Sequence, residues 1–131
     1  MFVTGYFTIE RNIRGLSTRE MELRLGFRPG RLTQGARILV LDREPLPNEY
    51  EPVGSSLFPN GTGLDAHALQ ETKFRPGAWL GERLVKVEPT IPHSGFEWYP
   101  PASAAVEQWK LTLPVSAREV SCLAAGERFW G

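Results

Sequence analysis

The tetrapeptide Phe-Arg-Pro-Gly occurs twice in this chain, at residues 27–30 and 74–77, and each copy leads through a glycine into an apolar run. In a type II turn, Pro presets φ at the second position and Gly accepts the positive φ of the third. Each copy therefore predicts a tight turn ahead of a strand, with the Phe anchoring the turn in the core. We interpret the repeat as two similar turn-to-strand entries. The alternative is a paired site in which Arg28 and Arg75 face one ligand.

A length of 131 residues predicts a single domain, residues 1–131, with one hydrophobic core. Hydrophobic residues make up 41% of the chain, which argues against disorder. No apolar stretch approaches the roughly 20 residues of a membrane-spanning helix, and no secretory signal is visible. We therefore expect a soluble, cytoplasmic protein without membrane contact, although export that needs no signal peptide is compatible with the sequence. Cys122, the one cysteine, is expected to be a buried thiol.

Apolar runs, some of them alternating with polar residues, predict five strands. They cover residues 2–9, 36–42, 83–88, 105–113 and 118–124. We expect Pro114 to separate the last two strands. The run at 36–42 is the clearest, since four consecutive apolar residues indicate burial on both faces of a sheet. Residues 43–63 are interrupted by Pro and Gly and are expected to form mostly a long loop.

Residues 18–25 carry conflicting signals. Between Met21 and Phe27, apolar and polar residues alternate with the two-residue period of a strand. Ser17 and Glu20 nevertheless have the spacing of a capping box, and Gly26 suits the left-handed position that ends a helix. We therefore predict a helix at 18–25.

The order of these elements predicts the fold class. A second short helix is predicted at residues 64–71. Because the strands do not alternate regularly with helices, the sequence indicates an α+β fold. We expect a mostly antiparallel sheet of about five strands, one or two short helices and long loops.

Basic residues are concentrated near the N-terminus. Residues 1–43 contain eight Arg and no Lys against four acidic residues, whereas the whole chain has no net charge. The candidate ligand-binding residues are Arg11, Arg14, Arg28 and Arg31, in two loops that flank the predicted helix. Guanidinium groups that converge from two loops bind phosphate or carboxylate groups. A solvated charged face is the alternative interpretation.

The candidate catalytic residues are Glu49, Glu51 and His67. In an extended segment Glu49 and Glu51 would place two carboxylates side by side, and His titrates near neutral pH. The Glu-x-Glu pattern resembles that of ADP-ribosyl-transferring enzymes, in which it binds a ribose hydroxyl and polarises the reacting centre. In those enzymes the pattern comes late in the chain, whereas here it lies in the first half. Solvated loop carboxylates and a bystander His are the alternative.

The sequence contains none of the common nucleotide-loop, hydrolase or zinc motifs, and we expect no cofactor and no metal. Our main hypothesis is a small soluble binding domain. Its Arg-rich N-terminal region would recognise a phosphate-bearing or acidic partner: a nucleotide, RNA or an acidic protein. The first alternative is a toxin-like enzyme that acts on a nucleotide or nucleic acid. The second is an assembly subunit that uses C-terminal aromatic residues such as Trp98 and Trp130.

Overall fold

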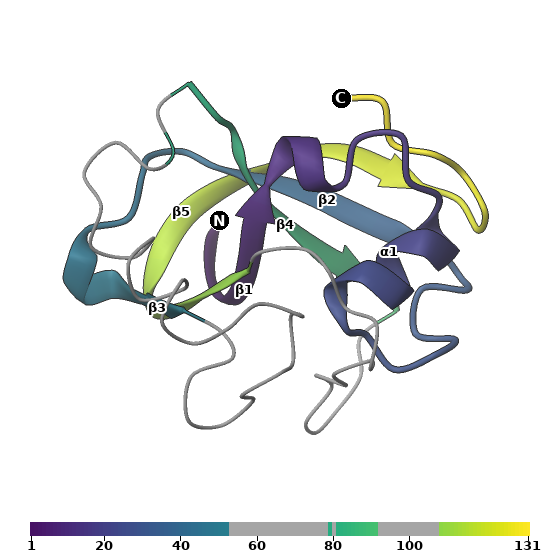
Figure 1. Cartoon of the computed structure of the whole chain (residues 1–131), viewed down its shortest axis with the longest axis horizontal. Helices are drawn as coiled ribbons and strands as arrows, with labels where there is room; N and C mark the ends of the chain where they lie inside the picture. The colour runs from purple at the N-terminus through teal and green to yellow at the C-terminus, as the bar shows by residue number, and fades with distance from the viewer. Residues whose placement is uncertain (53–78, 80, 92–107) are drawn as a thin grey trace.

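The computed structural model describes residues 1–52, 79, 81–91 and 108–131 (Figure 1). In these residues five antiparallel strands, one α-helix and two short 3-10 helices form the α+β fold that the sequence predicts. The strands are β1 (Phe2–Ile9), β2 (Ala36–Leu41), β3 (Tyr50–Pro52), β4 (Leu84–Pro89) and β5 (Trp109–Leu123). The helices are η1 (Glu10–Asn12), α1 (Thr18–Leu25) and η2 (Pro47–Glu49).

The five strands form one closed sheet. Neighbouring strands follow the order β1-β4-β2-β5-β3, and an additional pairing between β1 and β5 closes it. In Figure 1, β5 is the long curved strand that connects the two sides of this sheet. Its first part pairs with β1 and β3, and its second part pairs with β2. A closed sheet encloses the side chains of one face, and the other face is left for α1.

Two hydrophobic clusters lie on opposite faces of β2. Leu39 and Leu41 belong to the enclosed cluster, whereas Ile38 and Val40 belong to the cluster that contains the buried apolar residues of α1. The alternation follows from the two-residue period of a strand. The prediction that this strand is buried on both faces is therefore confirmed. The enclosed cluster contains the aromatic side chains of Phe7, Tyr50, Trp79 and Trp109.

Capping and packing together explain why residues 18–25 form a helix. Ser17 Oγ accepts a hydrogen bond from the Glu20 backbone N–H, and the Glu20 carboxylate accepts one from the Ser17 N–H, each at 3.2 Å. Gly26 ends the helix with a φ of 83°. Met21 and Leu25 lie one turn apart and are both buried. Helix packing thus overrides the strand-like alternation, and the predicted bounds are confirmed.

Pro114 does not separate two strands, so that prediction was wrong. β5 is one strand of 15 residues, and Pro114 lies inside it. Val3 pairs with Val115 and Gly5 with Leu111, so β5 advances four residues while β1 advances two. Pro has no N–H to donate to a neighbouring strand and is tolerated where such a bulge interrupts the ladder. The bulge lets β5 bend and contribute to both halves of the closed sheet.

Cys122 is exposed, contrary to the expectation of a buried thiol. It pairs in register with Arg37, while the next residue, Leu123, pairs with Ala36. Paired residues share a face of the sheet, and Leu123 is the one that enters the core beneath α1. Cys122 must therefore lie on the opposite face, with Arg37.

Some predictions concern residues outside the described part of the chain. They include the helix at 64–71, the second Phe-Arg-Pro-Gly copy and the aromatic group around Trp98. Within the segment expected to be a loop, the structure adds η2 and the short strand β3. Among the described residues no helix has the length and apolar character needed to cross a membrane.

Candidate functional site

The first Phe-Arg-Pro-Gly copy forms the turn that its sequence predicts. The Arg31 N–H donates to the Arg28 carbonyl oxygen at 3.0 Å, and Gly30 has a φ of 90°. Phe27, just before the turn, packs against the core beneath α1. Pro29 and Gly30 thus occupy the two central positions of a tight turn, with the arginines on either side.

A buried carboxylate fixes this loop to α1. Glu22 is only 5% exposed, and its two oxygens accept hydrogen bonds from the Gly30 N–H at 3.0 Å and the Leu32 N–H at 2.6 Å. Both amides lie in the loop, so the side chain holds its backbone in one position. Sequence reasoning missed this residue. The signal was present, since Glu22 has helical spacing to Thr18 and Leu25 on the buried face.

Arg28 and Arg31 line a surface pocket of about 270 Å³. Its other described lining residues are Pro29, Gly30, Thr33, Gln34 and Ile91, and none of these is acidic. We call this the loop pocket. Arg28 is exposed and Arg31 half-buried. Two guanidinium groups on one pocket favour an anionic group as occupant.

Arg11 and Arg14 lie outside the loop pocket, and both face carboxylates. Arg14 Nη2 lies 2.6 Å from Glu10 Oε1, and Arg11 Nε lies 3.7 Å from Glu82 Oε1. Glu10 is only 4% exposed, so its partner guanidinium compensates a buried charge. Of the four candidate arginines, the structure therefore brings Arg28 and Arg31 together on one pocket and pairs the other two with acids.

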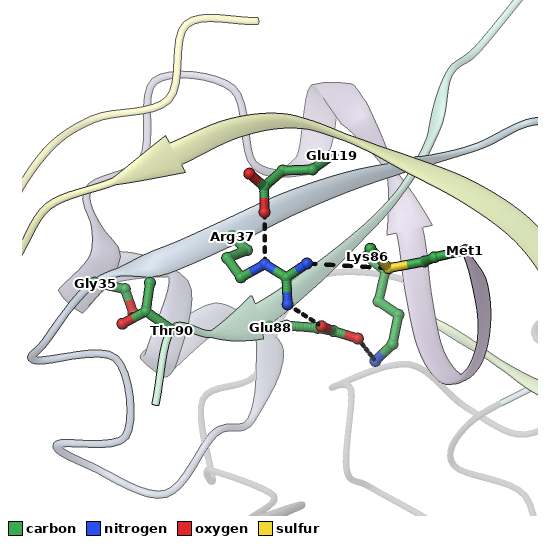
Figure 2. Close-up of polar contacts among 7 residues, drawn as sticks. All are labelled: Met1, Gly35, Arg37, Lys86, Glu88, Thr90 and Glu119. Carbon is green, nitrogen blue, oxygen red and sulfur yellow. Dashed lines mark hydrogen bonds and ion pairs between the residues drawn. The ribbon is translucent and has the colours of Figure 1, made fainter. Parts of the chain in front are cut away.

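A balanced charged cluster joins three strands (Figure 2). Arg37 of β2 donates through Nε to Glu119 of β5 at 2.5 Å, and its Nη1 lies 3.5 Å from Glu88 of β4. Lys86 Nζ lies 3.7 Å from the other carboxylate oxygen of Glu88. Two cations face two carboxylates, so the cluster connects the strands and offers no net positive charge to a ligand.

Glu49 forms a bidentate ion pair. Arg43 donates to its two oxygens at 2.7 and 2.8 Å, and the Leu46 N–H donates to one of them at 2.7 Å. These hydrogen bonds, those of Arg43 foremost, lower the pKa of Glu49 to about 2. A carboxylate with such a pKa is a poor general base at neutral pH. Glu49 also lies in η2, so the extended segment that would align it with Glu51 begins one residue later, at Tyr50.

Glu51 takes part in a row across three strands. In register, Glu51 of β3 faces Lys110 of β5, and Lys110 faces Tyr6 of β1. The Lys110 ammonium lies 5.9 Å from the centre of the Tyr6 ring. Burial, and secondarily the negative charge of Glu51, raises the pKa of Tyr6. The row stabilises strand pairing through opposite charges and a cation–π contact.

His67, the third candidate catalytic residue, lies outside the described residues. Within the described ranges no three His, Cys, Asp or Glu side chains form a group that could hold a metal ion. Comparison of the chain with known protein families, curated proteins and solved structures found no match. The functional argument therefore depends on the loop pocket itself.

Proposed function

We propose that this chain is a binding domain that recognises a phosphate-bearing ligand through the loop pocket. The observation that carries the proposal is that two guanidinium groups, those of Arg28 and Arg31, line one pocket beside the turn. The planar guanidinium group matches the oxygens of phosphate in a bidentate manner. A nucleotide or RNA would supply such a group.

The rigid backbone of the loop supports this proposal. Ordering a binding loop costs free energy that weakens affinity. Here the two hydrogen bonds to Glu22 hold the loop backbone before any ligand arrives. The free energy that ordering the loop backbone would cost is therefore not subtracted from the affinity, whereas ordering the exposed Arg28 side chain costs about 0.5–1.5 kcal/mol.

The distribution of charge also supports it. Arg11, Arg14, Arg37 and Arg43 each face a carboxylate within 4 Å. Among the described residues no carboxylate pairs with Arg28, and the exposed Arg19 and Arg24 lie on the helix that leads into the loop. Within the described residues, arginines on α1 and beside the loop pocket therefore offer positive charge to a ligand.

Calorimetric titration with adenosine monophosphate, a short single-stranded RNA and inorganic phosphate tests the proposal. We expect binding of at least one of these ligands, with an affinity that falls as salt rises because the contact is electrostatic. Arg28→Gln or Arg31→Gln should weaken it at least about tenfold, since a charged hydrogen bond contributes roughly 1.5–3 kcal/mol. Unchanged affinity in both variants would refute the assignment of the pocket.

Arg11→Gln is the matched control. It removes one exposed guanidinium from a pair at 3.7 Å and leaves the loop pocket intact. We expect no change in ligand affinity. A loss equal to that of Arg28→Gln would show that the two loops act on one ligand, as the sequence alone suggests. Mass spectrometry of the titrated ligands separates binding from turnover, because an enzyme would convert the ligand.

A further inference from the structure

The loop pocket has an apolar wall beside its two arginines. Ile91 and Pro29 both line the pocket. Ile91 lies two residues beyond the end of β4 and is 44% exposed, and Pro29 is exposed as well. An inorganic phosphate would contact the guanidinium groups and leave this apolar surface in water. The pocket therefore offers more contacts than a small anion alone can use.

Strand register explains why a residue that follows β4 reaches the loop that precedes β2. The two strands are antiparallel, and Ala36 at the start of β2 pairs with Pro89 at the end of β4. Residues that follow Pro89 therefore run beside the residues that precede Ala36, and those form the end of the loop. Ile91 is thus brought to a pocket whose other described lining residues all belong to the loop.

Hydrogen bonds of Thr90 fix this arrangement. Its hydroxyl donates to the Gln34 carbonyl oxygen at 2.8 Å, and its N–H donates to the Gly35 carbonyl oxygen at 3.3 Å. Thr90 and Gly35 lie side by side in Figure 2. Gly35 itself is so close to β5 that a Cβ would lie 2.5 Å from the Leu123 carbonyl oxygen. The apolar wall is therefore held at the end of the loop, as Glu22 holds the turn from α1.

The dimensions of the pocket suit a ligand with one ring. Its volume of about 270 Å³ is close to the lower end of small-molecule sites, about 300 Å³, and larger than a phosphate group needs. We propose that the loop pocket binds a phosphate monoester that carries an aromatic ring, the chemical class to which mononucleotides belong. Arg28 and Arg31 bind the phosphate, and the face of the ring packs on Ile91. This inference rests on the proposed function and adds the organic group that is recognised.

Contact of the ring with Ile91 sets the size of the expected preference. A tenfold gain in affinity requires the burial of about 55 Å² of apolar surface, ring and protein together. One face of an aromatic ring on the exposed side chain provides an area of this order. We therefore expect an aromatic phosphate ester to bind about tenfold more tightly than an ester of the same charge without a ring.

Phenyl phosphate and methyl phosphate are the matched probes, because they differ in the ring and not in charge. The second pKa of a phosphate ester is about 6, so both are dianions at about pH 8. Each is titrated calorimetrically into the full chain at constant ionic strength, and phenyl phosphate should bind about tenfold more tightly. Equal affinities would overturn the inference and leave the proposed function intact. Absence of binding by both probes would refute the inference together with the proposed function.

Variants separate the apolar wall from the basic one. Ile91→Ser removes the apolar wall and should reduce the preference for phenyl phosphate to less than about threefold. Leu46→Ser is the matched control and should retain the wild-type preference, since Leu46 is 58% exposed and does not line the loop pocket. Arg28→Gln should weaken both probes, because it removes a partner of the phosphate that they share. An Ile91→Ser protein that keeps the tenfold preference would contradict the assignment.

A measurement on the wild-type protein does not depend on the folding of any variant. The methyl signals of Ile91 and Leu46 are assigned in ¹³C-labelled protein, and nuclear Overhauser effects to the ring protons of phenyl phosphate are recorded. We expect these effects at Ile91 and none at Leu46. Bound phenyl phosphate without such an effect at Ile91 would overturn the inference even if both probes bind.

Discussion

At the scale of single residues, Glu49 shows how a local contact decides the chemistry of a carboxyl group. Three hydrogen bonds stabilise its ionised form, two from Arg43 and one from the Leu46 N–H. Each of them favours the carboxylate over the neutral acid, which is why the pKa falls. The same bonds occupy the oxygens that a substrate proton would need. Glu49 therefore contributes to folding rather than to acid–base chemistry.

The lowered pKa of Glu49 predicts a pH dependence of stability. Because the folded pKa is about 2 and the ordinary value is 4.5, the stabilisation is complete above about pH 4.5. It is lost as the pH falls toward 2, where the folded protein also takes up the proton. Urea denaturation between pH 2 and 7 should show this loss as a fall in the free energy of unfolding. In the Glu49→Gln variant this free energy should depend less on pH between about 4.5 and 2.

Arg43→Gln provides the control for this prediction, because it removes two of the three hydrogen bonds from the other side. It should flatten the same part of the curve of unfolding free energy against pH. The double variant should lose little more unfolding free energy than either single variant. If Glu49→Gln leaves the acid dependence of unfolding unchanged, the stabilising role of the ion pair is wrong.

At the scale of elements, α1 and the loop that follows it act as one unit. Glu22 lies inside the helix, yet its hydrogen bonds go to Gly30 and Leu32 of the loop. The helix ends at Gly26, and Phe27 packs against the same core. The position of the loop pocket thus depends on a helix residue that does not line it.

Glu22→Gln should destabilise the protein by about 1–3 kcal/mol, since an amide offers one acceptor oxygen where the carboxylate offers two. One backbone N–H then faces the NH₂ group of the new side chain. We also expect weaker phosphate binding at the loop pocket, although no pocket residue changes. Chemical denaturation measures the first effect, and calorimetric titration the second.

Glu20→Gln is the matched change on the same helix. Glu20 is partly exposed and belongs to the capping box, which accepts Gln as well as Glu. It should change stability by less than Glu22→Gln and leave ligand binding as it is. Equal effects of the two variants on stability and on ligand affinity would contradict the role assigned to the contact between Glu22 and the loop.

At the scale of the whole molecule, the C-terminal segment completes the core beneath α1. The Phe129 N–H donates to the Leu16 carbonyl at 3.0 Å, and the Gly15 N–H donates to the Phe129 carbonyl at 2.5 Å. Phe129 is 2% exposed, whereas the neighbouring Trp130 is 74% exposed. Chain ends that are far apart in sequence are therefore joined by backbone hydrogen bonds and one buried ring.

Replacement of these two neighbours should change the free energy of unfolding by very different amounts. Phe129→Ala is expected to cost about 3–5 kcal/mol, as for other buried aromatic residues. Trp130→Ala should change the free energy of unfolding by less than about 1 kcal/mol. Size-exclusion chromatography of the Trp130 variant tests the assembly hypothesis, because an aromatic interface would lose its exposed ring. An oligomeric state that changes with Trp130→Ala would support that hypothesis over the binding domain.

The sequence by itself was sufficient for the features whose cause is local. The bounds of α1 follow from Ser17, Glu20 and Gly26, and the first turn follows from Pro29 and Gly30. Capping and turn formation involve neighbours within a few residues, so their signals are readable along the chain. The same locality placed Arg28 and Arg31 on one loop before the structure showed the pocket between them.

Only the tertiary structure decided which charges cancel and where strands end. Arg37 meets Glu119, which is 82 residues away in sequence, and β5 continues through Pro114 because a bulge opposite β1 absorbs it. Both depend on strand register, which is set by the packing of the entire sheet. Composition predicts a basic N-terminal region. Coulomb attraction weakens with distance, however, so a charge is mainly cancelled by the side chains that the fold brings within a few ångströms of it. The positive charge available to a ligand is therefore a property of the folded molecule.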